Sequence, residues 1–131
     1  ITVTSTDDLL LARMDARLIV QVIINLVNNA IKYTQKGSRI QILTDKLGSD
    51  VRIRVTDDGP GIPDEAKPFV FDLCYTGANR IADSRRSLGL GLCLCRSIIR
   101  AHGRDISVSD NTPSGCIFTF TLPCEEVAIH E

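Results

Sequence analysis

The longest amphipathic pattern in the chain runs from Ala16 to Thr34. At about 100° per residue, its apolar side chains fall on one broad face of a helix and its polar side chains on a narrower stripe. The apolar face comprises Leu18, Ile19, Val22, Ile23, Leu26, Val27 and Ala30, widened by Val20, Ile24 and Ile31. The stripe carries Arg17, Gln21, Asn25, Asn28, Asn29 and Lys32, with Tyr33 at its edge. This pattern predicts a helix whose apolar face is covered by a sheet.

The rest of the chain alternates between extended runs and helical patterns. Extended runs occupy residues 1–6, 9–14, 39–47, 51–56, 105–109 and 116–122. The runs 39–47 and 51–56 flank a Gly-Ser-Asp turn and predict a β-hairpin. Asp15 is a natural cap for the central helix, and Gly37 is its expected terminator. A short helix is expected over 64–72, and a second amphipathic helix opens at 88–92 and ends at Gly103. Strands separated by two long helices predict an α/β sandwich with one mixed sheet and helices on one face.

Composition narrows the class of protein. The chain has 131 residues, 44% of them hydrophobic, which is enough to close the core of one domain. Its net charge of -1 argues against a general nucleic-acid binder, because binding to a phosphate backbone needs a marked basic surplus or patch. The five cysteines form no CxxC pair, so they indicate neither a zinc site nor a disulfide framework. Cys93 and Cys95 are expected to be buried thiols in a reducing cytoplasm.

Two asparagines on the polar stripe, Asn25 and Asn29, stand one helical turn apart. Asn is a mediocre helix former, and its amide oxygen suits Mg²⁺, which keeps several waters and takes further ligands from substrate phosphates. The helix alone leaves two interpretations open: a site that faces a metal ion, or ordinary polar residues at the helix border.

Three glycine-bearing segments, 57–61, 89–91 and Gly115, lie at the ends of strands or the start of a helix. Glycine lets a ligand approach the backbone, although a tight turn would explain each segment equally well. Gly89 and Gly91 are more specific, because free N–H groups and the helix dipole form an anion site at a helix start. Neither a P-loop nor a dinucleotide fingerprint is present. The aperiodic stretch 73–87, which contains arginines, is typical of a functional loop.

Three ordered motifs carry a resemblance to a known family. The segments Asn25 to Tyr33, Asp57 to Ile62 and Gly89 to Leu92 resemble, in order and spacing, the N, G1 and G2 boxes of the sensor histidine kinase ATP-binding domain. That domain belongs to the superfamily of gyrase, Hsp90 and MutL. The resemblance implies a single domain, 1–131, excised from a larger protein. It also implies the Bergerat ATP-binding fold: an α+β two-layer sandwich with a mixed, mostly antiparallel five-stranded sheet, three helices on one face and a mobile ATP lid over 73–88.

The resemblance also assigns roles to residues. Asn29 would coordinate Mg²⁺, Asn25 would face the triphosphate, and Asp57 would accept a hydrogen bond from the adenine amino group. The implied nucleotide-binding set is Asn25, Asn29, Lys32, Tyr33, Asp57, Gly59, Gly61, Ile62, Leu88, Gly89, Leu90, Gly91, Leu92 and Cys116. The implied catalytic set is Asn25, Lys32 and three arginines that would reach the γ-phosphate, Arg80, Arg85 and Arg86.

One position separates the reaction types of this superfamily. Relatives that hydrolyse ATP place a Glu four residues before the metal-binding Asn, where it serves as general base. Asn25 stands there in this chain and cannot accept a proton at neutral pH. The chain departs from the family pattern at Cys74, where an aromatic is usual, and at Cys116, where a Thr often approaches adenine. His102 is expected to cap or pack, not to catalyse.

The expected function is therefore binding of Mg²⁺ and ATP, with transfer of the γ-phosphoryl group to a histidine in two-component signalling. The expected partners are a phosphoacceptor and dimerisation domain, absent from this chain, and a downstream response regulator. The chain is expected to be a monomer and the cytoplasmic domain of a membrane-anchored sensor kinase, similar to the potassium-sensing Kdp type. The alternatives are a stand-alone superfamily ATPase and an anti-sigma-type kinase, and both of these classes carry the Glu that Asn25 replaces.

Overall fold

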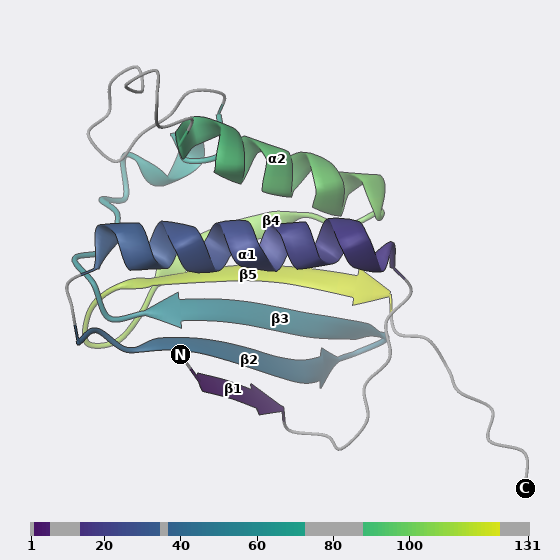
Figure 1. Cartoon of the computed structure of the whole chain (residues 1–131), viewed down its shortest axis with the longest axis horizontal. Helices are drawn as coiled ribbons and strands as arrows, with labels where there is room; N and C mark the ends of the chain where they lie inside the picture. The colour runs from purple at the N-terminus through teal and green to yellow at the C-terminus, as the bar shows by residue number, and fades with distance from the viewer. Residues whose placement is uncertain (1, 6–13, 35–36, 73–87, 124–131) are drawn as a thin grey trace, which may run out of the picture.

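In the part of the chain that the structure describes, the fold is an α/β sandwich in which two α-helices pack on one face of a β-sheet (Figure 1). The structure is a computed structural model that describes residues 2–5, 14–34, 37–72 and 88–123. The predicted sandwich is confirmed, and a single hydrophobic core of described residues lies between its layers. The predicted strand at 9–14 lies almost entirely outside the described residues.

The sheet has five strands among the described residues, in the order β1-β2-β3-β5-β4. The strands are β1 Thr2–Ser5, β2 Ile40–Leu47, β3 Asp50–Asp57, β4 Ile106–Asp110 and β5 Cys116–Pro123. β1 pairs with β2 in parallel, and all the other pairs are antiparallel. The predicted hairpin is β2–β3, in which Leu47 pairs with Asp50 across a two-residue turn that Gly48 enters at φ 61°. Because β3 and β5 are antiparallel, the end of β3 lies beside the start of β5.

The central helix α1, Ala16–Tyr33, begins at the predicted cap. The Asp15 carboxylate accepts hydrogen bonds from the backbone N–H groups of Arg17 and Leu18. At the other end, Thr34 leaves the helical conformation three residues before Gly37, so the helix ends earlier than its predicted terminator. Neither α-helix in the described part of the chain is long and apolar enough to cross a membrane.

The apolar face of α1 is narrower than predicted. Ile19, Val22, Leu26 and Ala30 are buried, and Ile23 and Val27 are partly buried against the core. The prediction is wrong for the other four apolar positions, which are 42% to 54% exposed: Leu18, Val20, Ile24 and Ile31. The reason is geometric, because the sheet and α2 contact only one arc of the cylinder.

The second helix, α2 Leu88–Ala101, packs beside α1 over β4 and β5. His102 joins the two helices at one end. Its Nδ1 donates to the Ile98 carbonyl over 2.8 Å, and its Nε2 accepts the backbone N–H of Asp15 over 3.0 Å. This is the capping and packing role that the sequence predicts for His102.

The third helix, predicted over 64–72, is only a 3₁₀ turn at Lys67–Phe69. An α-helix would need the N–H of residue 68 to bond the carbonyl of Asp64, and Pro68 has no N–H to donate. The chain instead makes shorter i to i−3 bonds, such as Phe69 N–H to the Ala66 carbonyl over 2.9 Å. The prediction of three helices is therefore wrong, because the described residues contain two α-helices and one 3₁₀ turn.

Candidate functional site

Asp57, the last residue of β3, is a buried carboxylate, 7% exposed. The β3–β5 ladder ends one pair earlier, at Thr56 and Ile117. Beyond that pair, the Asp57 side chain takes over as acceptor: Oδ1 receives the N–H of Gly59 over 2.9 Å and the N–H of Cys116 over 3.3 Å. No described residue donates to Oδ2. Asp57 thus has one oxygen fixed by the protein and one available to a ligand that donates.

The loop between β4 and β5, residues 111–115, holds the backbone that follows β3. The Asn111 amide donates from Nδ2 to the Asp57 carbonyl over 2.8 Å, and the Ser114 hydroxyl donates to the Asp58 carbonyl over 3.2 Å. Gly115, at φ 106°, approaches so closely that a Cβ there would lie 1.9 Å from the Asp57 carbonyl oxygen. Only glycine fits this position.

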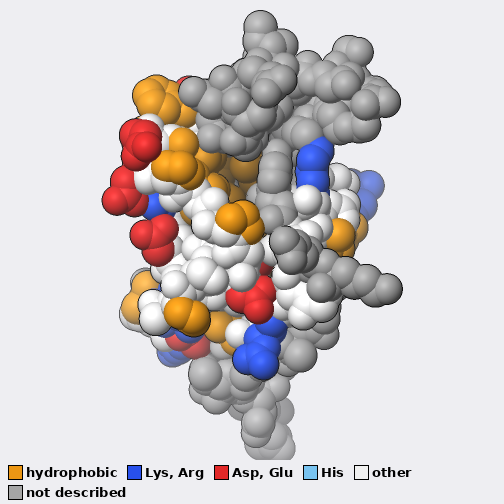
Figure 2. Space-filling model, turned by 90° about the vertical axis from the view of Figure 1, so that its left-hand side faces the viewer, with side chains coloured by type: hydrophobic (Ala, Val, Ile, Leu, Met, Phe, Trp, Pro, Cys, Tyr) orange, Lys and Arg blue, Asp and Glu red, His pale blue; other side chains and the backbone are white. Residues whose placement is uncertain are grey.

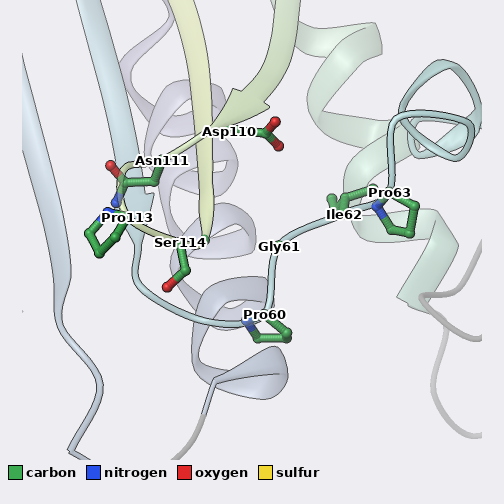
Figure 3. Close-up of a pocket in the computed structure, with 9 residues that line it drawn as sticks. Pro60, Gly61, Ile62, Pro63, Asp110, Asn111, Pro113 and Ser114 are labelled. Atoms are coloured by element: carbon green, nitrogen blue, oxygen red, sulfur yellow. The ribbon is translucent and has the colours of Figure 1, made fainter.

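Gly59, Gly61 and Ile62 form the loop that runs away from Asp57. Gly61 has φ 82°, and a Cβ there would lie 3.4 Å from the Gly115 carbonyl oxygen. The two loops face each other across an open cavity of about 640 Å³ (Figure 3). The cavity is lined by Pro60, Gly61, Ile62, Pro63, Asp110, Asn111, Pro113, Ser114 and Gly115.

Lys67 links the loop after β3 to the end of β4. Its Nζ donates to the Ile62 carbonyl over 3.0 Å and lies 2.9 Å from the Asp110 carboxylate, and it also pairs with Asp64. Hydrogen bonds from Lys67 to Asp64 and to Asp110 raise the pKa of the lysine. Residues 57–63, which form one side of the cavity, are therefore held in place by Lys67 and, through it, by Asp110 at the end of β4.

Cys116, at the start of β5, is buried beside Asp57. Burial, and after it the charge of Asp57, raise the pKa of the Cys116 thiol to about 11. The thiol is therefore neutral at physiological pH, and the charged group at this point of the site is the Asp57 carboxylate.

The two asparagines of α1 lie in different surroundings. Asn25 faces α2: its Cγ lies 4.0 Å from the position a Cβ would take on Gly91, and its amide lies against the buried Cys95 thiol. Burial raises the pKa of that thiol to about 12. Asn29 is half-buried, and no described residue hydrogen-bonds its amide. Of the two, Asn29 is the amide with an oxygen available to a cation.

The remaining predicted residues fall around these groups. Lys32 is exposed in the last turn of α1, which ends at Tyr33. Leu88, Gly89, Leu90 and Gly91 make the first turn of α2, where backbone N–H groups lack partners within the helix. Leu92 is buried in the core, and Ile62 is partly buried and packs against that core. Arg80, Arg85 and Arg86, with Cys74 and most of the predicted lid, lie outside the described residues.

Acidic side chains are unevenly distributed at the end of the molecule that holds Asp57. Figure 2 looks onto the end where β3 finishes and α2 begins, and acidic side chains gather along one side of it. Among the described residues, the exposed acidic ones at this end are Asp58, Asp64, Glu65 and Asp72 in the segment after β3, and Asp110 at the end of β4. α1 carries no acidic residue between Ala16 and Tyr33. An anion would therefore meet less repulsion beside α1 than beside the loops.

Asn111, like Lys67 and Ser114, is a residue of this site that the sequence analysis did not single out. It stands in Asn-Thr-Pro-Ser-Gly, a typical turn composition, and its partner Asp57 is 54 residues away. A turn pattern gives no information about such a distant partner, so only the fold could reveal the contact.

Comparison with known proteins identifies the family. Residues 14–126 match the family described as histidine kinase-, DNA gyrase B- and HSP90-like ATPase. The catalytic domain of the histidine kinase ThkA superposes with a TM-score of 0.79 at 34% identity, over 93% of this chain and 78% of that one. The chain therefore belongs to this ATPase family, and within it to the histidine kinase catalytic domains.

Two further matches show which branch and which assembly the chain is similar to. The sensor protein KdpD of Clostridium acetobutylicum is 42% identical over 125 residues, which are 95% of this chain and 14% of that protein. This similarity supports the Kdp-type resemblance. ThkA crystallised with the response regulator TrrA superposes with a TM-score of 0.76 at 33% identity, over 93% of this chain and 33% of that one. The chain thus spans a minor part of these larger proteins.

Proposed function

We propose that this domain binds ATP with Mg²⁺ and presents the γ-phosphoryl group to a histidine on a separate phosphoacceptor domain. The observation that supports this most directly is the Asp57 carboxylate, with Oδ1 held by two backbone N–H groups and Oδ2 without a described donor. A carboxylate oxygen accepts hydrogen bonds only, so it is an acceptor suited to the amino group of adenine.

The phosphate groups would lie between α1 and the start of α2. Asn29 offers the amide oxygen for Mg²⁺, which takes its other ligands from phosphate and water. When bound, the ion would neutralise charge on the phosphates. The N–H groups of the first turn of α2 point along the helix axis toward its start, where they can donate to phosphate oxygens. These roles agree with the absence of acidic residues from α1.

Transfer, not hydrolysis, is the reaction we assign. Asn25 lies at the helix interface against Gly91 and Cys95, and an amide cannot take a proton from water at neutral pH. Catalysis would then consist of holding ATP in position and neutralising its charge. The acceptor histidine, the response regulator downstream and the membrane-anchored parent protein are part of the proposal. The complex of ThkA with TrrA is a precedent for the regulator.

The adenine assignment is tested by Asp57→Asn, with Asp58→Asn as matched control. Asn at 57 keeps an oxygen for Gly59 and Cys116 but turns an N–H toward the adenine amino group, so calorimetry should show ATP affinity falling about 100-fold. Asp58 is exposed, and among the described residues its carboxylate accepts only the Arg39 N–H, so its variant should bind like the parent. Equal affinity of both variants would contradict the assignment.

The reaction class is tested by phosphate release from this chain with Mg²⁺ and ATP. We expect turnover far below about one per second, the lower end of ordinary enzymes. A turnover near that value would favour a stand-alone ATPase. Incubation with a separately prepared phosphoacceptor domain and γ-labelled ATP should instead move the label to a histidine.

A further inference from the structure

We propose that Asn111 is a positioning residue that sets the orientation of Asp57 and so the selectivity of the site for adenine. This inference rests on the proposed function, because it concerns how the base is recognised. It starts from the hydrogen bond between Asn111 Nδ2 and the Asp57 carbonyl oxygen, 2.8 Å long.

The orientation of the Asn111 amide is fixed by its two partners. Its Oδ1 accepts the backbone N–H of Thr112 over 2.9 Å, so its Nδ2 must be the atom that faces Asp57. The Asn111 N–H in turn donates to the Gly115 carbonyl over 2.9 Å and closes the loop on itself. Figure 3 shows Asn111 on the β4–β5 loop, across the cavity from Pro60 and Ile62. The donor is therefore part of a closed turn.

Asn111 acts on the Asp57 backbone at the point where pairing with β5 has ended, while β2 still pairs with Asp57 through Ile40. The regular β3–β5 pairs end at Thr56 and Ile117, and the next N–H along β5, that of Cys116, bonds the Asp57 carboxylate. The Asp57 carbonyl is thus left to Asn111, on a residue that is 7% exposed. A rotation of this peptide would turn the carboxylate as well, because both belong to one residue.

Close packing makes the arrangement sensitive to this bond. The Gly115 backbone lies against the Asp57 carbonyl, with no room for even a Cβ. Without the Asn111 donor, the buried carbonyl has no described partner and must move to find water. Oδ2 would then no longer face the position where the amino group of the base must lie.

The experiment compares the affinities of this chain for ATP and inosine triphosphate by calorimetry. Inosine carries a carbonyl oxygen where adenine carries its amino group, so it cannot donate to Asp57. We expect Asn111→Ala to weaken ATP about tenfold and to leave the affinity for inosine triphosphate within twofold. Asn111→Asp keeps the acceptor for Thr112 and loses only the donor. It should reduce the ratio of the affinities for ATP and inosine triphosphate as much as Asn111→Ala does. This second variant keeps the test valid if the alanine variant does not fold.

Ser114→Ala is the matched control. It removes a similar hydrogen bond from the same loop, but to the Asp58 carbonyl, and should leave the ratio of affinities unchanged. If either Asn111 variant keeps the ratio of the unaltered chain, or weakens both nucleotides equally, Asn111 has only a structural role and the inference is overturned. Equal affinity of the unaltered chain for the two nucleotides would instead contradict the proposed function.

Discussion

The two ends of the proposed nucleotide site are built differently. At the base end, Asp57 is bonded through both its carboxylate and its carbonyl to Gly59, Cys116 and Asn111. At the phosphate end, no described residue hydrogen-bonds the Asn29 amide. The base end is therefore part of the folded structure before any ligand binds, whereas the Asn29 amide has no described hydrogen-bond partner without a ligand.

Because of this difference, we expect substitutions in different regions to change stability and nucleotide binding to different extents. A change at the base end removes contacts that hold the fold together, so stability and nucleotide recognition should change together. A change at Asn29 removes a group that contributes little to the folded state and should reduce binding alone. A third region, the far end of the sheet, should affect stability alone.

The largest effect is expected for Gly115→Ala. Its Cβ would lie 1.9 Å from the Asp57 carbonyl oxygen at a φ of 106°, so the variant combines a clash with backbone strain. We expect a loss of more than about 3 kcal/mol in the free energy of unfolding, together with loss of ATP binding. Gly48→Ala is the control, because Gly48 also has a positive φ, 61°, but no atom within 4 Å of the added Cβ. It should cost about 1 kcal/mol and leave binding intact; equal costs in urea unfolding would refute the close-approach argument.

Asn29→Ala should weaken ATP in the presence of Mg²⁺ about 100-fold while leaving the melting temperature almost unchanged. Asn28→Ala is its control, since Asn28 is an exposed neighbour of the same type on the same helix. Calorimetry and thermal melts of both variants measure the two quantities. A large fall in melting temperature for Asn29→Ala would show that its amide is part of the folded framework, against the distinction drawn here.

The smallest effect is expected at the Asp50–Arg104 ion pair, which joins the start of β3 to the segment after α2. Arg104 donates two hydrogen bonds to the Asp50 carboxylate, over 2.9 and 2.7 Å. These hydrogen bonds hold the pKa of the Asp50 carboxyl below its usual value. The pair therefore stabilises the fold above the unfolded-state pKa of about 3.9, and this contribution is lost as the pH falls through the lower folded-state pKa.

Asp50→Asn should accordingly lower the melting temperature by a few degrees at pH 7, with a difference that shrinks below about pH 4. ATP affinity should not change. A stability difference that persisted at low pH would mean that the ionised carboxylate is not its source.

Local pattern was sufficient where neighbours in sequence decide the structure. Asp15 caps the helix that follows it, and the Gly48 turn fixes the register of its hairpin. It failed where distant segments decide. The exposure of Val20 and Ile24 depends on how much of α1 the sheet and α2 cover. The shortened third helix is a different case, because Pro68, whose missing N–H donor prevents an α-helix, stands inside the predicted segment itself.

The same limit applies to the site. Motif spacing pointed to Asp57 and Asn29, and the fold places both at one end of the sandwich. It could not reveal that Asn25 packs against Gly91, or that Asn111 bonds Asp57, because both contacts join segments far apart in the chain. Their chemistry depends on tertiary distance, which residue type does not encode.

The most direct test is a crystal structure of this chain with Mg²⁺ and a non-hydrolysable ATP analogue. The account predicts the adenine amino nitrogen within about 3 Å of Asp57 Oδ2 and the metal ion on the Asn29 amide oxygen. A base bound away from Asp57, or a metal ion held without Asn29, would contradict it.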